Sequence, residues 1–399
     1  MFSIIVPILL IAVAAIGYAS LENSKKPDTG ANDTAPPLTQ EENDSAVPGI
    51  PDVPGEKRVS FLAVGDNLIH ERVFTYADQN AGELNDGNYD FKPSYKHVKD
   101  IIQKADLAFV NQETIIGGDH LGISGYPAFN SPKQLASDLV ETGFNMINGA
   151  SNHTLDKLFE GIQHSASVWR EFEDVIFVGA YDTQEDADTI RVIEREGIKF
   201  SLLAYTYGTN GYKLPNSYSV PLFDKDKITR DVERAKEISD VVMVSAHWGN
   251  ENTYVVSEEQ VAYAQLFADL GVDLVIGTHP HVIQSLEWVE GKNGNKTLVA
   301  YSLGNFLSTM ELVDTQLEGM LSLDFVRNEE DDTVLMENIV WTPLVNHFGD
   351  GTFRVMPLKE YTAELNAVHF VLGEQKPDAI QYFKTKTKEI IGDKFDIDM

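Results

Sequence analysis

Short apolar runs alternate with longer amphipathic segments from Arg58 onward. The short runs are rich in β-branched and aromatic residues, and the longer segments repeat their apolar residues at helical spacing, a pattern typical of βα units in a layered α/β fold. The predicted strands are Val59–Val64, Leu107–Val110, Asn145–Ile147, Ile176–Val178, Phe200–Ala204, Val241–Ser245 and Leu274–Ile276. The predicted helices are Pro93–Lys104, Pro132–Glu141, Lys157–Phe172, Asp226–Ile238 and Ser257–Leu270.

The pattern changes after Pro280. β-rich runs then follow one another with little helical sequence between them, at Val282–Val289, Thr297–Tyr301, Met320–Val326 and Val334–Val345. Consecutive strands without intervening helices pair readily as hairpins, so this half of the sheet system is predicted to be antiparallel. A last helix is predicted near Pro377–Ile390.

The N-terminal segment has a different character. Residues 2–19 read FSIIVPILLIAVAAIGYA, with no charged side chain, and are about as long as a membrane-spanning helix. Residues 1–20 are therefore predicted to anchor the chain in a membrane; a buried core helix is the less favoured interpretation, because the segment stands at the terminus. Gly17-Tyr18-Ala19 resembles a cleavage site, but no basic segment precedes it, which favours an uncleaved anchor.

The next segment predicts a spacer. Residues 21–57 are rich in Asn, Asp, Glu, Pro, Thr and Ser, and such a composition buries too little apolar surface to offset the entropy of ordering. We therefore divide the chain into an anchor (1–20), a flexible acidic linker (21–57), a domain (58–350) and a C-terminal extension with the last helix (351–399). This order predicts a domain held outside the cell membrane, or secreted if the N-terminus is cleaved.

The composition of the chain excludes some classes of partner and some kinds of site chemistry. The chain has 62 acidic and 31 basic residues, for a net charge of -31, and this field repels nucleic acid. We therefore expect no nucleic-acid partner. The absence of cysteine excludes disulfides, thiolate metal sites, thiol nucleophiles and a lipid-modified cysteine. Any metal ion must be held by His, Asp, Glu or Asn.

Five predicted strands are followed by side chains that can bind metals. In chain order these are Asp66 and His70; Asn111 and Glu113; Asn152, His153 and Asp156; His247; and His279 and His281. Ligands of α/β sheets bind beyond the carboxyl ends of the strands, so we expect these groups to meet at one edge. Imidazole and carboxylate groups suit manganese, iron or zinc, and a shared carboxylate can bridge two ions about 3.5–4 Å apart.

Each signal by itself also has a structural interpretation. An aspartate after a strand is commonly a turn former or helix cap, and His247 alone, or Asn152 with His153, could serve packing. His279 and His281 flank Pro280, and alternate residues of an extended segment point to the same side. Metal binding and a structural role both remain open for that pair alone. The occurrence of all these groups at strand ends favours a metal site.

The ordered motifs GDNLIH, NQET, SNHTLD, HWGNE, GTHPHV and YSLGNF resemble those of the CapA family of poly-γ-glutamate capsule synthesis proteins, a branch of the calcineurin-like metallophosphatase superfamily. The resemblance spans Val59–Leu307 and implies an α/β fold, a layered β-sheet sandwich flanked by helices. Two positions depart from the superfamily pattern. His70 follows Asp66 by four residues rather than two, and Glu113 stands where the superfamily has aspartate.

The resemblance implies a site with two divalent ions, of manganese, iron or zinc. One ion would be held by Asp66, His70 and His281, the other by Asn152, His247 and His279, with Glu113 bridging. His153 would face the substrate as an acid or oxyanion donor, with Asp156 beside it at the catalytic centre. Around the ligands or the substrate we expect Asn111, Trp248, Glu251 and Asn305, each of which could instead be structural.

Three functions are compatible with these features. The resemblance implies a component of poly-γ-glutamate synthesis or export that works beside membrane subunits of a synthase complex. A free-standing phosphoesterase or amidase acting on cell-envelope material is the second, and a metal-stabilised scaffold without turnover is the third. An anionic polymer is a candidate substrate, although a net charge of -31 requires metal ions or a local basic lining to attract it.

Overall fold

The computed structural model describes residues 57–399. Its first strand, β1 (Lys57–Asn67), shows why the protein forms two layers of sheet. Successive side chains of a strand point to opposite faces. Val59, Phe61 and Ala63 face an inner core, whereas Leu62 and Val64 face a second core on the other side. All five are buried, so β1 must be covered on both faces.

The first sheet has nine strands and combines parallel and antiparallel pairing. Its main order is β14-β13-β12-β1-β2-β3-β4, with β11 beside β1 and β15 beside β13. The pairs from β1 to β4 are parallel, and those from β1 through β12 and β13 to β14 are antiparallel. The bounds are β2 (Leu107–Asn111), β3 (Met146–Asn148), β4 (Ile176–Val178), β11 (Asn305–Leu307), β12 (Leu317–Arg327), β13 (Val334–Gly349), β14 (Thr352–Pro357) and β15 (Asp396–Ile397).

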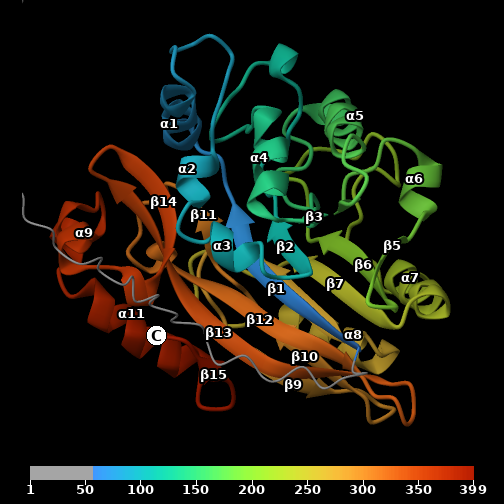
Figure 1. Cartoon of the computed structure of the whole chain (residues 1–399). Helices are drawn as coiled ribbons and strands as arrows, with labels where there is room; N and C mark the ends of the chain where they lie inside the picture. Colours follow the sequence, from blue (N-terminus) through green and yellow to red (C-terminus); the bar gives the residue numbers. More distant parts are fainter. Residues whose placement is uncertain (1–56) are drawn as a thin grey trace, which may run out of the picture. The chain divides into compact units, whose positions relative to one another are not determined.

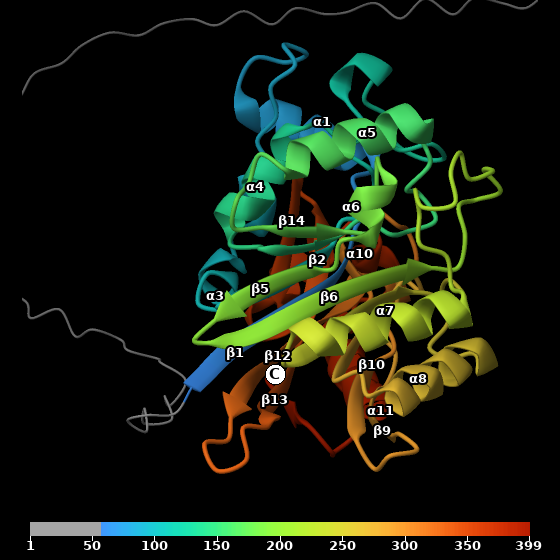
Figure 2. The ribbon, with the colours of Figure 1, turned by 90° about the vertical axis from the view of Figure 1, so that its right-hand side faces the viewer.

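The second sheet has six strands in the order β5-β6-β7-β8-β10-β9. Its four central strands are parallel, and both edge strands pair antiparallel. The bounds are β5 (Arg191–Arg195), β6 (Ile198–Thr206), β7 (Val241–His247), β8 (Leu274–Thr278), β9 (Leu286–Glu290) and β10 (Lys296–Ala300). The long β6 and its neighbour β5 are seen in the foreground of Figure 2.

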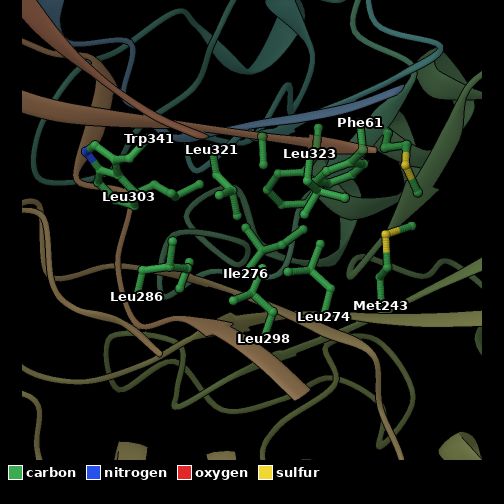
Figure 3. Packing of buried hydrophobic residues seen from close by; sticks show 14 of the residues in the cluster. Phe61, Met243, Leu274, Ile276, Leu286, Leu298, Leu303, Leu321, Leu323 and Trp341 are labelled. Carbon is green, nitrogen blue, oxygen red and sulfur yellow. The ribbon is translucent and has the colours of Figure 1, made fainter. Parts of the chain in front are cut away.

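The inner core joins the two sheets. Phe61, Leu321 and Leu323 of the first sheet pack with Met243 and Leu274 of the second in one buried cluster (Figure 3). Each side chain is at most 2% exposed, and full burial of one such side chain contributes about 1.5–3 kcal/mol. This core fixes the two sheets against each other.

Helices cover the outer faces (Figure 1). Helices α1 to α5 contribute to the core outside the first sheet, and α7 and α8 to the core outside the second. The bounds are α1 (Glu71–Ala81), α2 (Lys92–Tyr95), α3 (Lys99–Ile102), α4 (Gln134–Thr142), α5 (Leu158–Trp169), α6 (Gln184–Asp188), α7 (Lys225–Ile238), α8 (Glu258–Leu270), α9 (Ala363–Val368), α10 (Leu372–Gln375) and α11 (Ala379–Ile391). The chain is thus a mixed α/β protein of two packed sheets flanked by helices, as the sequence predicts at this level.

The seven strands predicted before Pro280 all correspond to observed strands. After Pro280, β12 pairs antiparallel with β13 and β9 with β10, as expected, but β10 also pairs parallel with β8, and β14 was not predicted. The segment Pro93–Lys104 differs, because α2 and α3 are separate short helices interrupted at residues 96–98 rather than one helix. Val282–Val289 is a strand only from Leu286 onward. Helix α1 and strand β5 were not predicted, since polar residues dominate both segments and obscure the apolar spacing.

The C-terminal residues contribute to the same two-sheet unit. β14 extends the first sheet, and Phe383 and Ile391 of α11 join the inner core. The predicted anchor of residues 1–20 and residues 21–56 of the predicted linker lie outside the described residues. Within residues 57–399, no helix is both long enough and apolar enough to cross a membrane.

Candidate metal centre

Strand ends from both sheets meet at one place. Asp66 lies near the end of β1, Asn111 ends β2, and His247 ends β7. The Nδ2 atom of Asn111 donates to Oδ1 of Asp66 at 2.7 Å and lies 3.5 Å from Nδ1 of His247. The parallel strands of the two sheets therefore direct their carboxyl ends to a common site, as expected for this class of fold.

Asp66 is fixed by contacts from the second sheet. Its Oδ2 accepts a hydrogen bond from the backbone N–H of His279 at 3.1 Å and lies 3.1 Å from Nδ1 of His281. Gly65 packs so closely on the carbonyl of Gly304 that no β-carbon would fit, and the amide of Asp66 donates to that carbonyl at 2.9 Å. The glycine thus lets β1 approach the 304–305 segment and sets the position of the carboxylate.

Three sets of side chains bring ligand atoms within 4.8 Å of one another. They are Glu113 with His247 and His279; Asp66 with Glu113 and His281; and Glu251 with His279 and His281. Glu113 belongs to two sets: its Oε1 lies 4.0 Å from Nε2 of His247 and 3.8 Å from Nε2 of His281. This carboxylate therefore lies between the two buried sets.

The chemistry of these atoms fits a cation. Both carboxylate oxygens of Glu113 and Nδ1 of His279 are buried without a hydrogen-bond partner. Burial, with the charges of Asp66 and Glu251, raises the pKa of Glu113 well above its ordinary value. Such groups are costly to bury unpaired, and a divalent ion would supply both a partner and a compensating charge. The buried His, Asp and Glu group is thus able to bind metal.

His247 and His279 are in the form that binds metals. Burial, followed by the proximity of His279 and His281, lowers the pKa of His247 well below its ordinary value. Burial and His281 likewise lower the pKa of His279. Both rings are therefore neutral near pH 7, and neutral imidazole is the ligand that metals require.

His279 and His281 do not lie in an extended segment, contrary to our expectation. β8 ends at Thr278, and the φ angles of His279 and His281 are 93° and 59°, in the left-handed region that non-glycine residues rarely adopt. Such a backbone costs about 1–3 kcal/mol per residue and persists where the surroundings enforce it. The turn still brings the two ring centroids to 5.7 Å.

Asn152 adds an oxygen beside His247. Its Oδ1 lies 2.8 Å from Nε2 of His247, while its Nδ2 donates to Oδ1 of Asn210 at 3.1 Å. The other ring nitrogen of His247, Nδ1, lies 3.0 Å from Oγ1 of Thr278. These contacts hold Nε2 of His247 and the Asn152 oxygen next to each other.

His153 and Asp156 form a buried pair beside these sets. Nδ1 of His153 lies 2.7 Å from Oδ2 of Asp156, which also accepts the backbone N–H of Phe129 at 2.8 Å. A carboxylate at this distance favours the ring proton on Nδ1 and leaves Nε2 available to exchange a proton. The ring of Phe129 packs edge-on against His153, with centroids 4.7 Å apart.

His70 lies at the margin and belongs to none of the three sets. Its Nδ1 accepts the backbone N–H of Thr309 at 3.2 Å, and its ring centroid is 5.3 Å from that of Phe129. Burial and the proximity of His281 lower its pKa to about 4. The structure therefore brings together Asp66, Glu113, His247, His279 and His281, and places His70 beside them.

The remaining predicted residues differ in their positions. Glu251 is exposed and belongs to the third set. Asn305 pairs with Asp66 across β11 and β1, and its Nδ2 donates to the carbonyl of His281 at 3.4 Å. Trp248 points away from the site: it packs in the outer core of the second sheet, and its Nε1 donates to the carbonyl of Tyr301 at 2.9 Å.

Some neighbouring residues were missed. Asn148 ends β3 and donates to Oδ1 of Asn111 at 2.7 Å, and Thr278 ends β8 against His247. Tyr207 follows β6, and its ring centroid is 4.6 Å from that of His279. All three occupy strand ends, so the signal that selected their neighbours would also have found them.

Comparisons with known proteins agree with this picture. The family model described as "Bacterial capsule synthesis protein PGA_cap" matches residues 60–310. Capsule biosynthesis protein CapA of Bacillus anthracis is 32% identical over 176 residues, which cover 42% of this chain and 41% of that protein. PGA biosynthesis protein CapA of Bacillus subtilis (strain 168) is 28% identical over 178 residues, covering 44% of this chain and 45% of that protein.

The match thus spans less than half the length of these curated relatives. Among solved structures, NAD nucleotidase of Haemophilus influenzae is similar with a TM-score of 0.43 and 11% identity, over 84% of this chain and 67% of that one. The family match covers more than half of the chain and confirms the resemblance stated from the motifs. The chain belongs to the bacterial capsule synthesis protein family PGA_cap, within the calcineurin-like metallophosphatase superfamily.

Proposed function

We propose that this protein is a metal-dependent hydrolase of poly-γ-glutamate capsule synthesis or export, with two divalent ions at the buried centre. The observation that carries the proposal is the position of Glu113, which two buried sets share and whose oxygens have no other partner. Shared carboxylates of this kind bridge two ions. Manganese, iron and zinc all suit these ligands.

Two sets of residues would hold the ions. Asp66, Glu113 and His281 would hold one, and Glu113, His247 and His279 the other, with Asn152 near the second. His70 lies beside the first. Ions bound here would activate a water molecule as nucleophile and neutralise negative charge that develops on a phosphoryl or carbonyl oxygen. This chemistry suits hydrolysis of a phosphoester or of an amide.

His153 would move the proton in this reaction. With Asp156 on Nδ1, Nε2 can first accept a proton from the attacking water, and the imidazolium paired with Asp156 can then donate that proton to a leaving group. We expect Asp156→Asn to lower kcat by roughly 100-fold, because the ring loses the carboxylate that orients it. Metal content measured on the same sample should stay unchanged. Loss of metal together with activity would contradict this division of roles.

The cellular setting is part of the proposal. The two relatives are named for capsule and PGA biosynthesis, which supports a place at the cell envelope. We propose that residues 1–20 anchor the chain in the membrane beside subunits of a polymer synthase, with the domain on the outer side. A chain with a net charge of -31 is unsuited to nucleic acid.

The test combines metal analysis with hydrolysis assays on the full-length chain. We expect about two transition-metal ions per chain and turnover of either bis(p-nitrophenyl) phosphate or poly-γ-glutamate. Turnover of the phosphodiester alone would favour a free-standing phosphoesterase. Metal without turnover of either substrate would favour a scaffold, and absence of metal would refute the centre.

A further inference from the structure

A cavity of about 610 Å³ adjoins the metal centre. Its walls come from α1, the residue 126 region, residues 309–311 and β14, and they include His70, Arg72, Tyr76, Tyr126, Glu311 and Phe353. Its volume lies in the range of about 300–1,000 Å³ that is typical of small-ligand sites. Figure 1 shows α1 close to β14, the edge strand of the first sheet.

His70 connects this cavity to the centre. It lines the cavity, and Phe129 packs against it on one edge and against His153 on the other, with centroid distances of 5.3 and 4.7 Å. Thr309, another wall residue, donates its backbone N–H to His70. A ligand reacting beside His153 and His281 would therefore have this cavity as its neighbouring space.

Arg72 is the single Lys or Arg among the described residues that line the cavity. Its guanidinium lies 4.5 Å from the ring centroid of Phe370, and its Nη1 lies 3.2 Å from Oε1 of Glu311. The side chains of Arg72 and Glu311 are 47% and 57% exposed. Ion pairs this exposed contribute about 0–1 kcal/mol, so a ligand carboxylate can replace Glu311 at little cost.

We propose that this cavity is the substrate groove of the metal centre, and that Arg72 receives a carboxylate of an extended acidic chain by displacing Glu311. The inference rests on the proposed function and adds to it the residue that selects the substrate. Among the described residues of this lining, which also carries Glu71 and Glu311, Arg72 is the one positively charged side chain that an acidic ligand would meet. Phe370 holds the guanidinium in place by stacking.

A second cavity, remote from the metal-binding sets, supplies a control residue for the proposed groove. It has a volume of about 520 Å³ and is lined by basic residues of α7, but none of its lining residues belongs to the metal-binding sets. Lys227 there is paired with Asp231 at 2.8 Å, and Arg234 donates to the carbonyl of Asp188. Arg230, exposed on the same helix, offers a matched arginine outside the proposed groove.

The test uses a fluorescently labelled chain of five γ-linked glutamates and the full-length protein, with manganese and again with a chelator. Arg72→Ala should weaken binding about tenfold at low salt, because a charged hydrogen-bond partner is lost. Glu311→Gln should instead strengthen it about threefold, because the competitor is removed. Arg230→Ala should leave it unchanged, and all three variants should keep the wild-type metal content and melting temperature.

The two substitutions separate a substrate site from a structural ion pair. If Arg72→Ala and Glu311→Gln both weaken binding, the pair only supports the fold and the proposal is wrong. It is equally wrong if the labelled chain fails to bind the wild type, or if Arg230→Ala alone weakens binding. Binding that depends on Arg72 in a protein without turnover would preserve the groove and refute the hydrolase. Hydrolysis of poly-γ-glutamate with a KM unaffected by Arg72→Ala would support the hydrolase and refute the groove.

Discussion

Replacing Glu113 by glutamine is expected to abolish metal binding and at the same time to stabilise the metal-free protein. Glu113 contributes to both buried sets, so its loss removes a ligand from each. We expect hydrolysis to fall by at least about two to three orders of magnitude, because the ions that would activate the water are lost. Wild-type protein should gain about 2.7 kcal/mol of unfolding free energy from manganese at 100 times its Kd, and the variant little.

The stabilisation of the metal-free variant follows from the pKa of Glu113. Burial, Asp66 and Glu251 raise this pKa, so the folded protein retains a proton that the unfolded chain releases as the pH rises above the ordinary value of 4.5. Stability is therefore lost with rising pH, and glutamine, which cannot ionise, removes that loss. Urea unfolding at pH 7 in EDTA should show a higher unfolding free energy for the variant than for the wild type.

A control distinguishes this effect from the general removal of a buried carboxylate. Burial raises the pKa of Asp273 to about 6, and its Oδ2 accepts the backbone N–H of Val242 at 2.8 Å, away from the metal-binding sets. Asp273→Asn should keep the wild-type response to manganese. If Glu113→Gln responds to manganese as the wild type does, Glu113 is not a ligand.

The strands could be predicted because a buried strand requires a run of apolar residues, which is visible in the local sequence. In β1, every position from Val59 to Val64 except Ser60 is apolar, as expected of a strand covered on both faces. The polar residue that follows such a run then falls at a sheet edge, and this reasoning alone selected Asp66, Asn111 and His247. Because parallel strands share one direction, their ends meet, and the site needs no knowledge of the loops.

Features that depend on contacts between residues far apart in the chain have no such pattern in the local sequence. The backbone of Thr309 reaches His70 across 239 residues, and the pairing of Arg72 with Glu311 is equally remote. Trp248 follows His247 directly and was assigned to the site, but successive residues point in opposite directions, and its ring belongs to the outer core. The left-handed backbone of His279 is likewise imposed by contacts with Asp66, not by its neighbours in sequence.

Glu318 is another residue whose environment the sequence conceals. In the alternating pattern of β12 its polar side chain would be expected on an exposed face, but residues 317–321 are all buried and Glu318 is fully enclosed. Gly304, with φ of 73°, packs on its carboxylate so closely that no β-carbon would fit. The proposed mechanism does not use this group, so its effect on stability can be measured separately.

Replacing Glu318 by glutamine is expected to raise the unfolding free energy at neutral pH and to leave it nearly unchanged near pH 4. Burial and the charge of Asp66 raise the pKa of Glu318 well above its ordinary value of 4.5, and the Asn305 amide only partly offsets this. The folded protein therefore keeps the proton while the unfolded chain releases it. This costs the wild type about 1.4 kcal/mol for each pH unit between the two pKa values.

Urea titrations from pH 4 to 7.5 in EDTA would measure the difference between the two proteins. The unfolding free energy of Glu318→Gln should exceed that of the wild type by an amount that grows with pH, because the amide mimics the protonated carboxyl. Glu287→Gln, on an exposed position of β9, should follow the wild-type curve at every pH. Parallel curves for Glu318→Gln and the wild type would mean that Glu318 ionises in the folded protein as readily as in the unfolded chain, and that a neighbouring group or water compensates its burial.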